Sequence, residues 1–264
     1  MQRTEPLDGL TLIVDEPEGA APRGTVLMLH GWPDSAALWD GSVAALADAW
    51  RCVRLTLPGF DDGDGRVAPT LDEVTTLIGR ALDHVSPEAP VTLLLHDWGC
   101  VFGYHWARLH PQRVQRVIGV DIGDAGSRAH VAGLGWRAKV GIAGYQLWLA
   151  LACRIGGALG DRMAQRLAAA MRVPPPLSRI RARMGWPYVA AWSGGLRATR
   201  PFEPQVPMLF VYGGRKPFLF HSQAWADTLA ARPGSRVLGL KTGHWVMLDA
   251  PQDFHAALRG WLDG

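Results

Sequence analysis

The chain has 264 residues, of which 48% are hydrophobic, enough for one large core or for a core with an inserted subdomain. Its net charge of +3 is too small to argue for a nucleic-acid partner. Three cysteines without a paired spacing predict neither a disulfide framework nor a metal site, and we expect no cofactor. Residues 1–9 lack the apolar core of a signal peptide, so we expect a reduced, cytoplasmic protein.

The first half of the chain alternates between short apolar runs and segments with helical spacing. The helical segments are residues 71–84 and 99–109. Strands and helices that alternate at this length predict a parallel sheet covered on both faces. The predicted strands are residues 25–30, 52–57, 91–95 and 114–120.

The pattern changes after residue 124. Residues 125–204 are helical in pattern, rich in arginine and without clear strand signals. Two strand runs then follow at residues 207–212 and 235–240, and a last amphipathic helix covers 251–262. The sheet is therefore predicted to be discontinuous in sequence. The predicted domains are a core of residues 1–124 and 205–264 and a helical cap of residues 125–204.

The most apolar segment, residues 141–160, is nearly long enough to span a bilayer. It also contains Arg154, five glycines and a tyrosine, so we interpret it as a buried helix of a lid, in preference to peripheral membrane contact. Residues 154–200 hold nine arginines and one acid, Asp161. This pattern is typical of a solvated helical face, which we favour, or of a surface that attracts anions or acidic lipid headgroups.

Residues 93–100, LLLHDWGC, place Asp97 between a predicted strand and a predicted helix. A nucleophile elbow has this form, because a sharp turn holds one side chain clear of the backbone and a small residue, here Gly99, allows close packing. The helix N-terminus also supports negative charge. An aspartate nucleophile would form an alkyl ester as its covalent intermediate. The alternative is that Asp97 only caps the helix.

Three motifs together resemble the epoxide hydrolase and haloalkane dehalogenase branch of the α/β-hydrolase superfamily. They are HGWPDS at 30–35, HDWG at 96–99 and TGHWVMLDAP at 242–251. Their order is that of the family: oxyanion loop, nucleophile, lid and histidine. The resemblance covers the whole chain and implies an α/β-hydrolase fold, with a mostly parallel, doubly covered sheet and an inserted helical cap.

The same resemblance implies a catalytic triad in which His244 is the general base. Many relatives carry the acid in a Gly-x-x-Asp loop, but Lys216 stands there, and a lysine cannot orient a histidine or stabilise its cation. Other relatives place the acid after the strand that follows the nucleophile helix. Asp121 lies there, 121 − 97 = 24 residues after Asp97. We assign Asp121 as the acid and Asp124 as the fallback, the alternative being that Asp121 only ends a strand.

The resemblance also implies the groups that stabilise developing negative charge. The backbone N–H groups of Trp32 and Trp98 are expected to form the oxyanion hole. Tyr145 lies in a Tyr-Gln-Leu-Trp segment that resembles the one bearing the first ring-opening tyrosine of soluble epoxide hydrolases. Tyr188 lies near the end of the cap, where a second such tyrosine is expected. The alternative for both tyrosines is ordinary packing.

We therefore expect a hydrolase that opens small apolar or aromatic epoxides to diols through an ester on Asp97. A halide leaving group would instead need two N–H donors. Trp98 offers one indole, but Trp32 stands where dehalogenases often carry asparagine. We favour the epoxide hydrolase over a dehalogenase, over another Asp-nucleophile hydrolase such as one acting on β-lactones, and over a silent binding protein. The oligomeric state cannot be read from the sequence.

Overall fold

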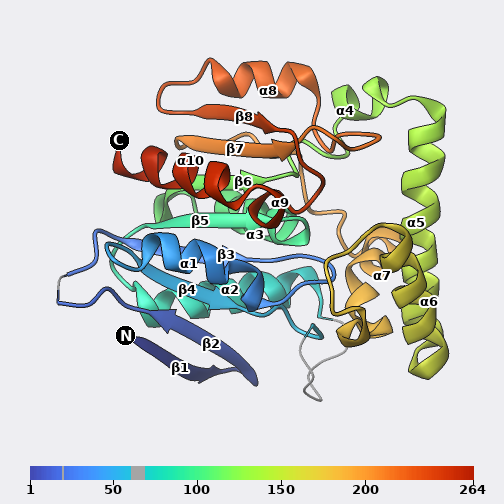
Figure 1. Cartoon of the computed structure of the whole chain (residues 1–264), viewed down its shortest axis with the longest axis horizontal. Coiled ribbons are helices and arrows are strands. Elements are labelled where there is room, and N and C mark those ends of the chain that lie inside the picture. The colour runs from blue at the N-terminus through green and yellow to red at the C-terminus, as the bar shows by residue number, and fades with distance from the viewer. Residues whose placement is uncertain (20, 61–68) are drawn as a thin grey trace.

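The computed structural model describes residues 1–19, 21–60 and 69–264 (Figure 1). Within them, eight strands form one sheet in the order β1-β2-β4-β3-β5-β6-β7-β8. The strands from β3 to β8 run parallel to one another, and β2 pairs antiparallel with both β1 and β4. The strands are β1 Gln2–Leu7, β2 Leu10–Asp15, β3 Thr25–Leu29, β4 Arg51–Leu55, β5 Val91–His96, β6 Val114–Val120, β7 Met208–Gly213 and β8 Arg236–Leu240.

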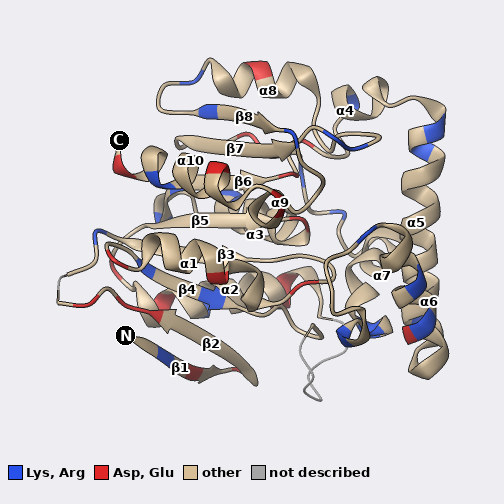
Figure 2. Ribbon diagram, in the orientation of Figure 1, with Lys and Arg blue, Asp and Glu red and all other residues tan. Residues whose placement is uncertain are grey.

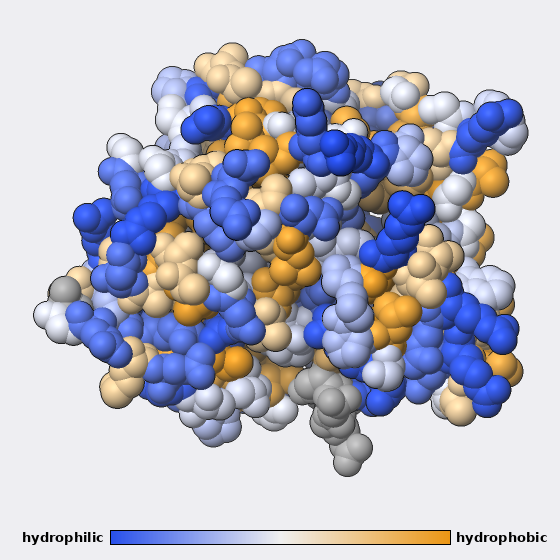
Figure 3. All heavy atoms as spheres, in the orientation of Figure 1, coloured by the Kyte–Doolittle hydropathy of each residue, from blue (hydrophilic) through white to orange (hydrophobic). Residues whose placement is uncertain are grey.

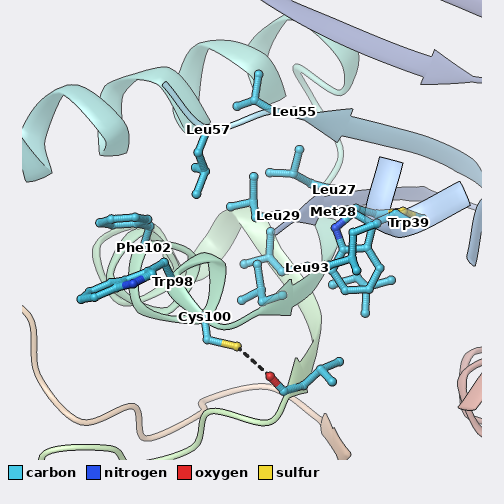
Figure 4. Packing of buried hydrophobic residues seen from close by; sticks show 14 of the residues in the cluster. Leu27, Met28, Leu29, Trp39, Leu55, Leu57, Leu93, Trp98, Cys100 and Phe102 are labelled. Carbon is cyan, nitrogen blue, oxygen red and sulfur yellow. Dashed lines mark hydrogen bonds between the residues drawn. The ribbon is translucent and has the colours of Figure 1, made fainter. Parts of the chain in front are cut away.

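The centre of the sheet is buried on both faces. β3 and β5 are buried along their whole length, as expected for parallel strands with helices on both sides. Leu29, Leu93 and Trp39 lie in this core (Figure 4). Helices α1 and α10 contact each other, as do α2 and α3. The helices beside the sheet are α1 Asp40–Leu46, α2 Leu71–Val85, α3 Trp98–Leu109, α8 Gln223–Ala230, α9 Val246–Asp249 and α10 Pro251–Asp263, with 3-10 turns at Ala36–Trp39 and Pro111–Arg113.

The predicted fold class is confirmed, but the sequence reading omitted the β1–β2 hairpin. β1 lies at the sheet edge, where exposed and half-buried residues alternate, so it has no continuous apolar run. Asp8 and Gly9 form the turn, with φ of 51° and 81°. An Asp-Gly pair of this kind is a strong hairpin signal and could have identified both strands.

A group of helices between β6 and β7 lies beyond the carboxyl ends of the parallel strands (Figure 1). Trp186 at the start of α7 donates from its indole Nε1 to the Pro58 carbonyl at 2.9 Å, which ties these helices to the loop after β4. The elements are α4 Arg128–Gly133, α5 Trp136–Ile155, α6 Gly157–Ala170, α7 Trp186–Ser193 and 3-10 turns at Leu177–Arg179 and Ala182–Gly185.

The prediction of one buried lid helix over residues 141–160 is wrong. Helix α5 ends at Ile155, and Gly156 adopts a φ of 65°, a conformation that favours glycine. Large apolar side chains of α5, including Leu147 and Leu151, are exposed. Mean hydropathy does not reveal which side of a helix faces its neighbours. Among the described residues, no helix is long and apolar enough to cross a membrane.

Candidate active site

Asp97 occupies a sharp turn between β5 and α3. Its φ is 52°, a left-handed conformation that is strained for a residue with a side chain. Gly99 and Gly31 allow the neighbouring backbone segments to pack closely against this turn, because a side chain at either position would clash with them. A Cβ on Gly99 would lie 2.3 Å from the Leu29 carbonyl oxygen, and one on Gly31 would lie 2.4 Å from the Asp97 Cβ. The turn therefore has the geometry expected of a nucleophile elbow.

The surroundings of Asp97 control its charge. Burial raises the pKa of its carboxyl to about 6, although the nearby His244 cation and the Trp98 backbone N–H act in the opposite direction. The negative charge of Asp34 adds to the rise. The carboxylate is thus ionised, and able to act as a nucleophile, at neutral pH but not at mildly acidic pH.

His244 and Asp121 are in direct contact. The His244 Nδ1 lies 2.5 Å from the Asp121 Oδ2, and the Asp121 side chain is fully buried at the end of β6. An ionised carboxylate can only accept a hydrogen bond, so Nδ1 carries the proton and Nε2 is left as the basic nitrogen. Burial lowers the pKa of His244, but the negative charges of Asp121 and Asp97 outweigh it, and the net pKa is raised.

Lys216, which occupies the position where many relatives carry the acid, forms an ion pair with the other oxygen of Asp121. The same oxygen accepts a hydrogen bond from the Gly213 backbone N–H at 3.1 Å. Only 9% of the Lys216 side chain is exposed. Burial would raise the pKa of Asp121, but the His244 and Lys216 cations hold it well below its usual range. The sequence shows Lys216 at this position, but it did not predict the contact of Lys216 with Asp121.

The fallback residue, Asp124, has other partners. Its Oδ1 accepts from the Ser222 backbone N–H at 2.6 Å, and its Oδ2 accepts from the Ser222 and Ser127 hydroxyls. Both serines are N-caps, of α8 and α4 respectively. Asp124 therefore ties two helix starts together, while Asp121 contacts the histidine.

Tyr145 and Tyr188 lie beside the elbow. Their ring centroids are 6.0 Å apart, and Tyr188 is 5.0 Å from the Trp98 ring and 6.2 Å from the Trp32 ring, each pair edge to face. Burial raises the pKa of both tyrosines, and the negative charge of Asp97 raises both further. Two tyrosines from the helices between β6 and β7 thus lie close enough to Asp97 for its charge to act on them.

The backbone N–H of Trp98 and the indole N–H of Trp32 differ in their hydrogen bonding. A Cβ on Gly31 would lie 2.5 Å from the Trp98 backbone nitrogen, so the loop that carries Trp32 lies directly against the elbow. The Trp98 backbone N–H hydrogen bonds Asp97. The indole Nε1 of Trp32 is buried and has no hydrogen-bond partner among the described residues. This unpaired donor beside the tyrosines is available to a ligand.

A network of hydrogen bonds and an ion pair surrounds the site, and the sequence analysis did not predict it. Asp34 is buried; it accepts from the Trp245 indole at 2.9 Å and pairs with Arg179 at 3.3 Å. It links the 30–35 loop, the histidine loop and the helices between β6 and β7. His96, which precedes Asp97, has its Nε2 3.1 Å from the His244 carbonyl. Among the described residues, no group of three or more His, Cys, Asp or Glu forms a metal site.

The chain is similar in sequence to several known proteins. The profile of the α/β hydrolase fold family matches residues 24–140. The chain is 33% identical over 110 residues to a cis-3-alkyl-4-alkyloxetan-2-one decarboxylase of Xanthomonas campestris. It is 31% identical over 120 residues to an epoxide hydrolase of Caballeronia sordidicola and 32% identical over 97 residues to a haloalkane dehalogenase of Sphingobium indicum. The matches cover 38%, 44% and 35% of this chain and 37%, 35% and 33% of the relatives.

Solved structures extend the likeness to the whole fold. A point mutant of an epoxide hydrolase from Bacillus megaterium superimposes with a TM-score of 0.72 at 16% identity, over 99% of this chain and 100% of that one. A loop variant of a haloalkane dehalogenase from Bradyrhizobium elkanii gives 0.70 at 17% identity, over 100% of this chain and 96% of that one. At these identities the likeness establishes the fold, and both activities occur on it.

Proposed function

Since the chain has the α/β-hydrolase fold and is similar to its epoxide hydrolase and haloalkane dehalogenase branch, we propose that it is a hydrolase whose nucleophile is Asp97. The reaction that we favour converts a small apolar or aromatic epoxide to a vicinal diol. The observation that supports the choice is that Tyr145 and Tyr188 adjoin each other and that the charge of Asp97 raises the pKa of both. We also propose that residues 125–204 form the cap over this site.

In the first step, an Asp97 oxygen attacks an epoxide carbon. The carbon–oxygen ring bond breaks, and its electron pair goes to the ring oxygen, which becomes an alkoxide. The tyrosine hydroxyls donate hydrogen bonds and a proton to that oxygen. The negative charge of Asp97 raises the pKa of both tyrosines. This charge is lost in the first step, because the carboxylate becomes an ester. The donors therefore become more acidic as the alkoxide forms.

In the second step, the Nε2 of His244 takes a proton from water, and the resulting hydroxide attacks the ester carbonyl carbon of Asp97. The oxyanion is held by the backbone N–H groups of Trp32 and Trp98. On collapse, the bond between the acyl carbon and the alkyl oxygen breaks, and the alkyl oxygen takes the proton held by His244 to complete the diol. The carboxylic acid left on Asp97 gives its proton back to the tyrosinate, which regenerates both the carboxylate and the tyrosine. Loss of the Asp97 charge in the ester lowers the pKa of His244, which favours the neutral imidazole that this step needs.

The decisive experiment separates the two steps. His244→Gln should still be alkylated but should not hydrolyse the ester, because attack at carbon needs no base whereas activation of water does. Intact-protein mass spectrometry should then show an adduct of one substrate mass. The adduct should map to the peptide that contains Asp97. An accepted epoxide that leaves no adduct on this variant would contradict the covalent mechanism.

A second candidate is a β-lactone decarboxylation, supported by the similarity to the oxetan-2-one decarboxylase. Asp97 would attack the sp³ ring carbon that is bonded to the ring oxygen. The bond between these two atoms would break, and the ring would open to a carboxylate. Loss of carbon dioxide would then supply the electron pair for a carbon–carbon double bond as Asp97 departs. A carboxylate leaving group needs no proton, so this reaction would not depend on the tyrosine hydroxyls. A turnover screen should therefore include terminal epoxides, haloalkanes and a cis-dialkyl oxetan-2-one, with diol, halide and alkene as products.

A further inference from the structure

Helix α5 carries a continuous apolar stripe on its outer face. The residues recur at the spacings that place side chains on one side of a helix. Trp136 is 71% exposed and Val140 63%. Hydrophobic residues are visible at the right-hand margin in Figure 3, where Figure 1 places α5. The stripe consists of Trp136, Val140, Leu147, Trp148, Leu151 and Ile155.

The opposite side of α5 provides its packing. Leu149, Ala150 and Ala152 are buried there, and the helix contacts α6 and α7. Tyr145, which lies near Asp97, is also on this inner side. The stripe is therefore not part of the core. Isolated exposed apolar residues are normal, but a stripe along a twenty-residue helix is typical of a surface that binds something.

The charges of α5 are all of one sign. The helix contains Arg137, Lys139 and Arg154 and no acidic residue. The Arg137 guanidinium lies 5.4 Å from the centroid of the Trp136 ring, so a cation and an exposed aromatic ring adjoin at the first turn. Arg154 lies in the last turn, next to Ile155. Basic groups thus stand at both ends of the apolar stripe.

These basic groups are not neutralised by the protein. In the described part of the chain, no ion pair joins Arg137, Lys139 or Arg154 to a carboxylate. Asp161 is the one acid among residues 128–193, against ten Lys and Arg. It accepts from the Ala182 backbone N–H at 2.7 Å and lies 3.9 Å from Arg181. Figure 2 shows Lys and Arg along α5 and α6.

We propose that the outer face of α5 binds the surface of an anionic lipid bilayer. The helix lies in the plane of the interface, with its apolar stripe at the boundary between headgroups and acyl chains and its arginines on lipid phosphates. Apolar burial and electrostatic attraction act together in this arrangement. Trp136 and Arg137 have an apolar body and a polar tip, which suits that boundary. The proposal is independent of the reaction catalysed.

Charge favours a membrane over a second copy of the chain. A symmetric contact through α5 would bring the same basic helices together, and like charges placed opposite each other weaken association. An anionic bilayer presents the opposite sign. Near such a surface each basic residue strengthens binding about fivefold, and the apolar stripe adds to this.

The test measures co-sedimentation of the whole chain with vesicles of phosphatidylcholine, with and without 30% phosphatidylglycerol. We expect binding to the anionic vesicles that weakens as salt is raised. Reversing two basic residues, in R137E/R154E, should weaken it at least tenfold. Interrupting the stripe, in V140E/L151E, should do the same. All four side chains are exposed, so thermal unfolding should change little.

Two control variants are matched in type. Leu109→Glu changes an apolar residue at the end of α3 that is 47% exposed, and Arg236→Glu changes an exposed arginine on β8. Both should bind the anionic vesicles as the unchanged protein does. Vesicles with brominated acyl chains should also quench tryptophan fluorescence, and Trp136→Phe should reduce that quenching.

Two results would overturn the proposal. One is equal binding by the stripe variants and the controls, or no binding to anionic vesicles. The other is a dimer in sedimentation equilibrium without lipid that V140E/L151E dissociates, because the stripe would then be an interface between copies. The hydrolase assays measure turnover independently of vesicle binding. Loss of vesicle binding with unchanged turnover would therefore not contradict the proposed reaction.

Discussion

The carboxyl edge of the sheet and the outer face of α5 differ in how completely their side chains are satisfied. At the sheet edge, Asp121 is fully buried, and His244, Lys216 and Gly213 contact its two oxygens. On α5, large apolar side chains are exposed to solvent, and no carboxylate among the described residues pairs with Arg137 or Arg154. A fixed polar network is what catalysis requires, since its groups must be preorganised. An unsatisfied amphipathic face is instead typical of a surface for a partner.

The largest expected effect is at the elbow. Asp97→Asn should abolish turnover, by at least about ten-thousandfold, because an amide is a very poor nucleophile. A single turnover in ¹⁸O-water with the unchanged protein should place the label in Asp97 before it appears in product. Label that appears first in the product would mean that water attacks the substrate directly.

Asp121→Asn should slow hydrolysis of the ester by about a thousandfold to ten-thousandfold, as loss of a triad acid does elsewhere. The change also leaves Lys216 as a buried, unpaired cation, which costs stability. The double variant D121N/K216M removes both charges and keeps the test interpretable if the single variant folds poorly. Asp124→Asn is the matched control, and a similar loss there would contradict the assignment.

The helices between β6 and β7 should contribute less than the sheet edge. Tyr145→Phe and Tyr188→Phe should each slow alkylation by an epoxide about ten- to a hundredfold, because one hydroxyl remains. The double variant should nearly stop it, while substrate binding weakens modestly because the rings are kept. Rapid-quench kinetics measures the step. If both variants are mild and Trp98→Phe is severe, the leaving group is a halide.

The buried nucleophile should also lower the stability of the fold. The folded-state pKa of Asp97, about 6, lies above the ordinary value of 3.8 for an aspartate, so the native state disfavours the ionised form. This difference corresponds to about 3 kcal/mol of stability, which is lost as the pH rises from about 4 through about 6 and stays lost at higher pH. Asp97→Asn should therefore be more stable than the unchanged protein at pH 8, with a gain that shrinks towards pH 4. Urea unfolding at both pH values measures it, and an equal gain at both would contradict this origin.

The smallest expected effect is at Lys216. Its positive charge lowers the pKa of His244, so Lys216→Met should raise that pKa. Because hydrolysis needs the neutral imidazole, the acidic limb of the kcat profile should move to higher pH, by about one unit or less. Arg215→Met, at the exposed neighbouring position, should leave the profile unchanged. A rate loss without a shift of the profile would mean that Lys216 acts only on the structure.

The local features of the fold could be predicted from the sequence alone. The strand-to-helix turn at Asp97 and the alternation of buried strands with helices follow from short-range patterns, which sequence displays directly. The edge hairpin was missed because β1 alternates polar and apolar residues, although the Asp-Gly turn marked it. Spacing and resemblance together identified Asp121, and the contact with His244 joins residues 123 positions apart.

Which side chains meet depends on the fold. Lys216 stands where many relatives carry the acid, yet the fold brings it into an ion pair with Asp121, because β6 and β7 are neighbours in the sheet. Hydropathy likewise does not predict which face of α5 is exposed. Periodicity gives a helix two sides, but the packing of α6 and α7 against one of them decides that the other is exposed.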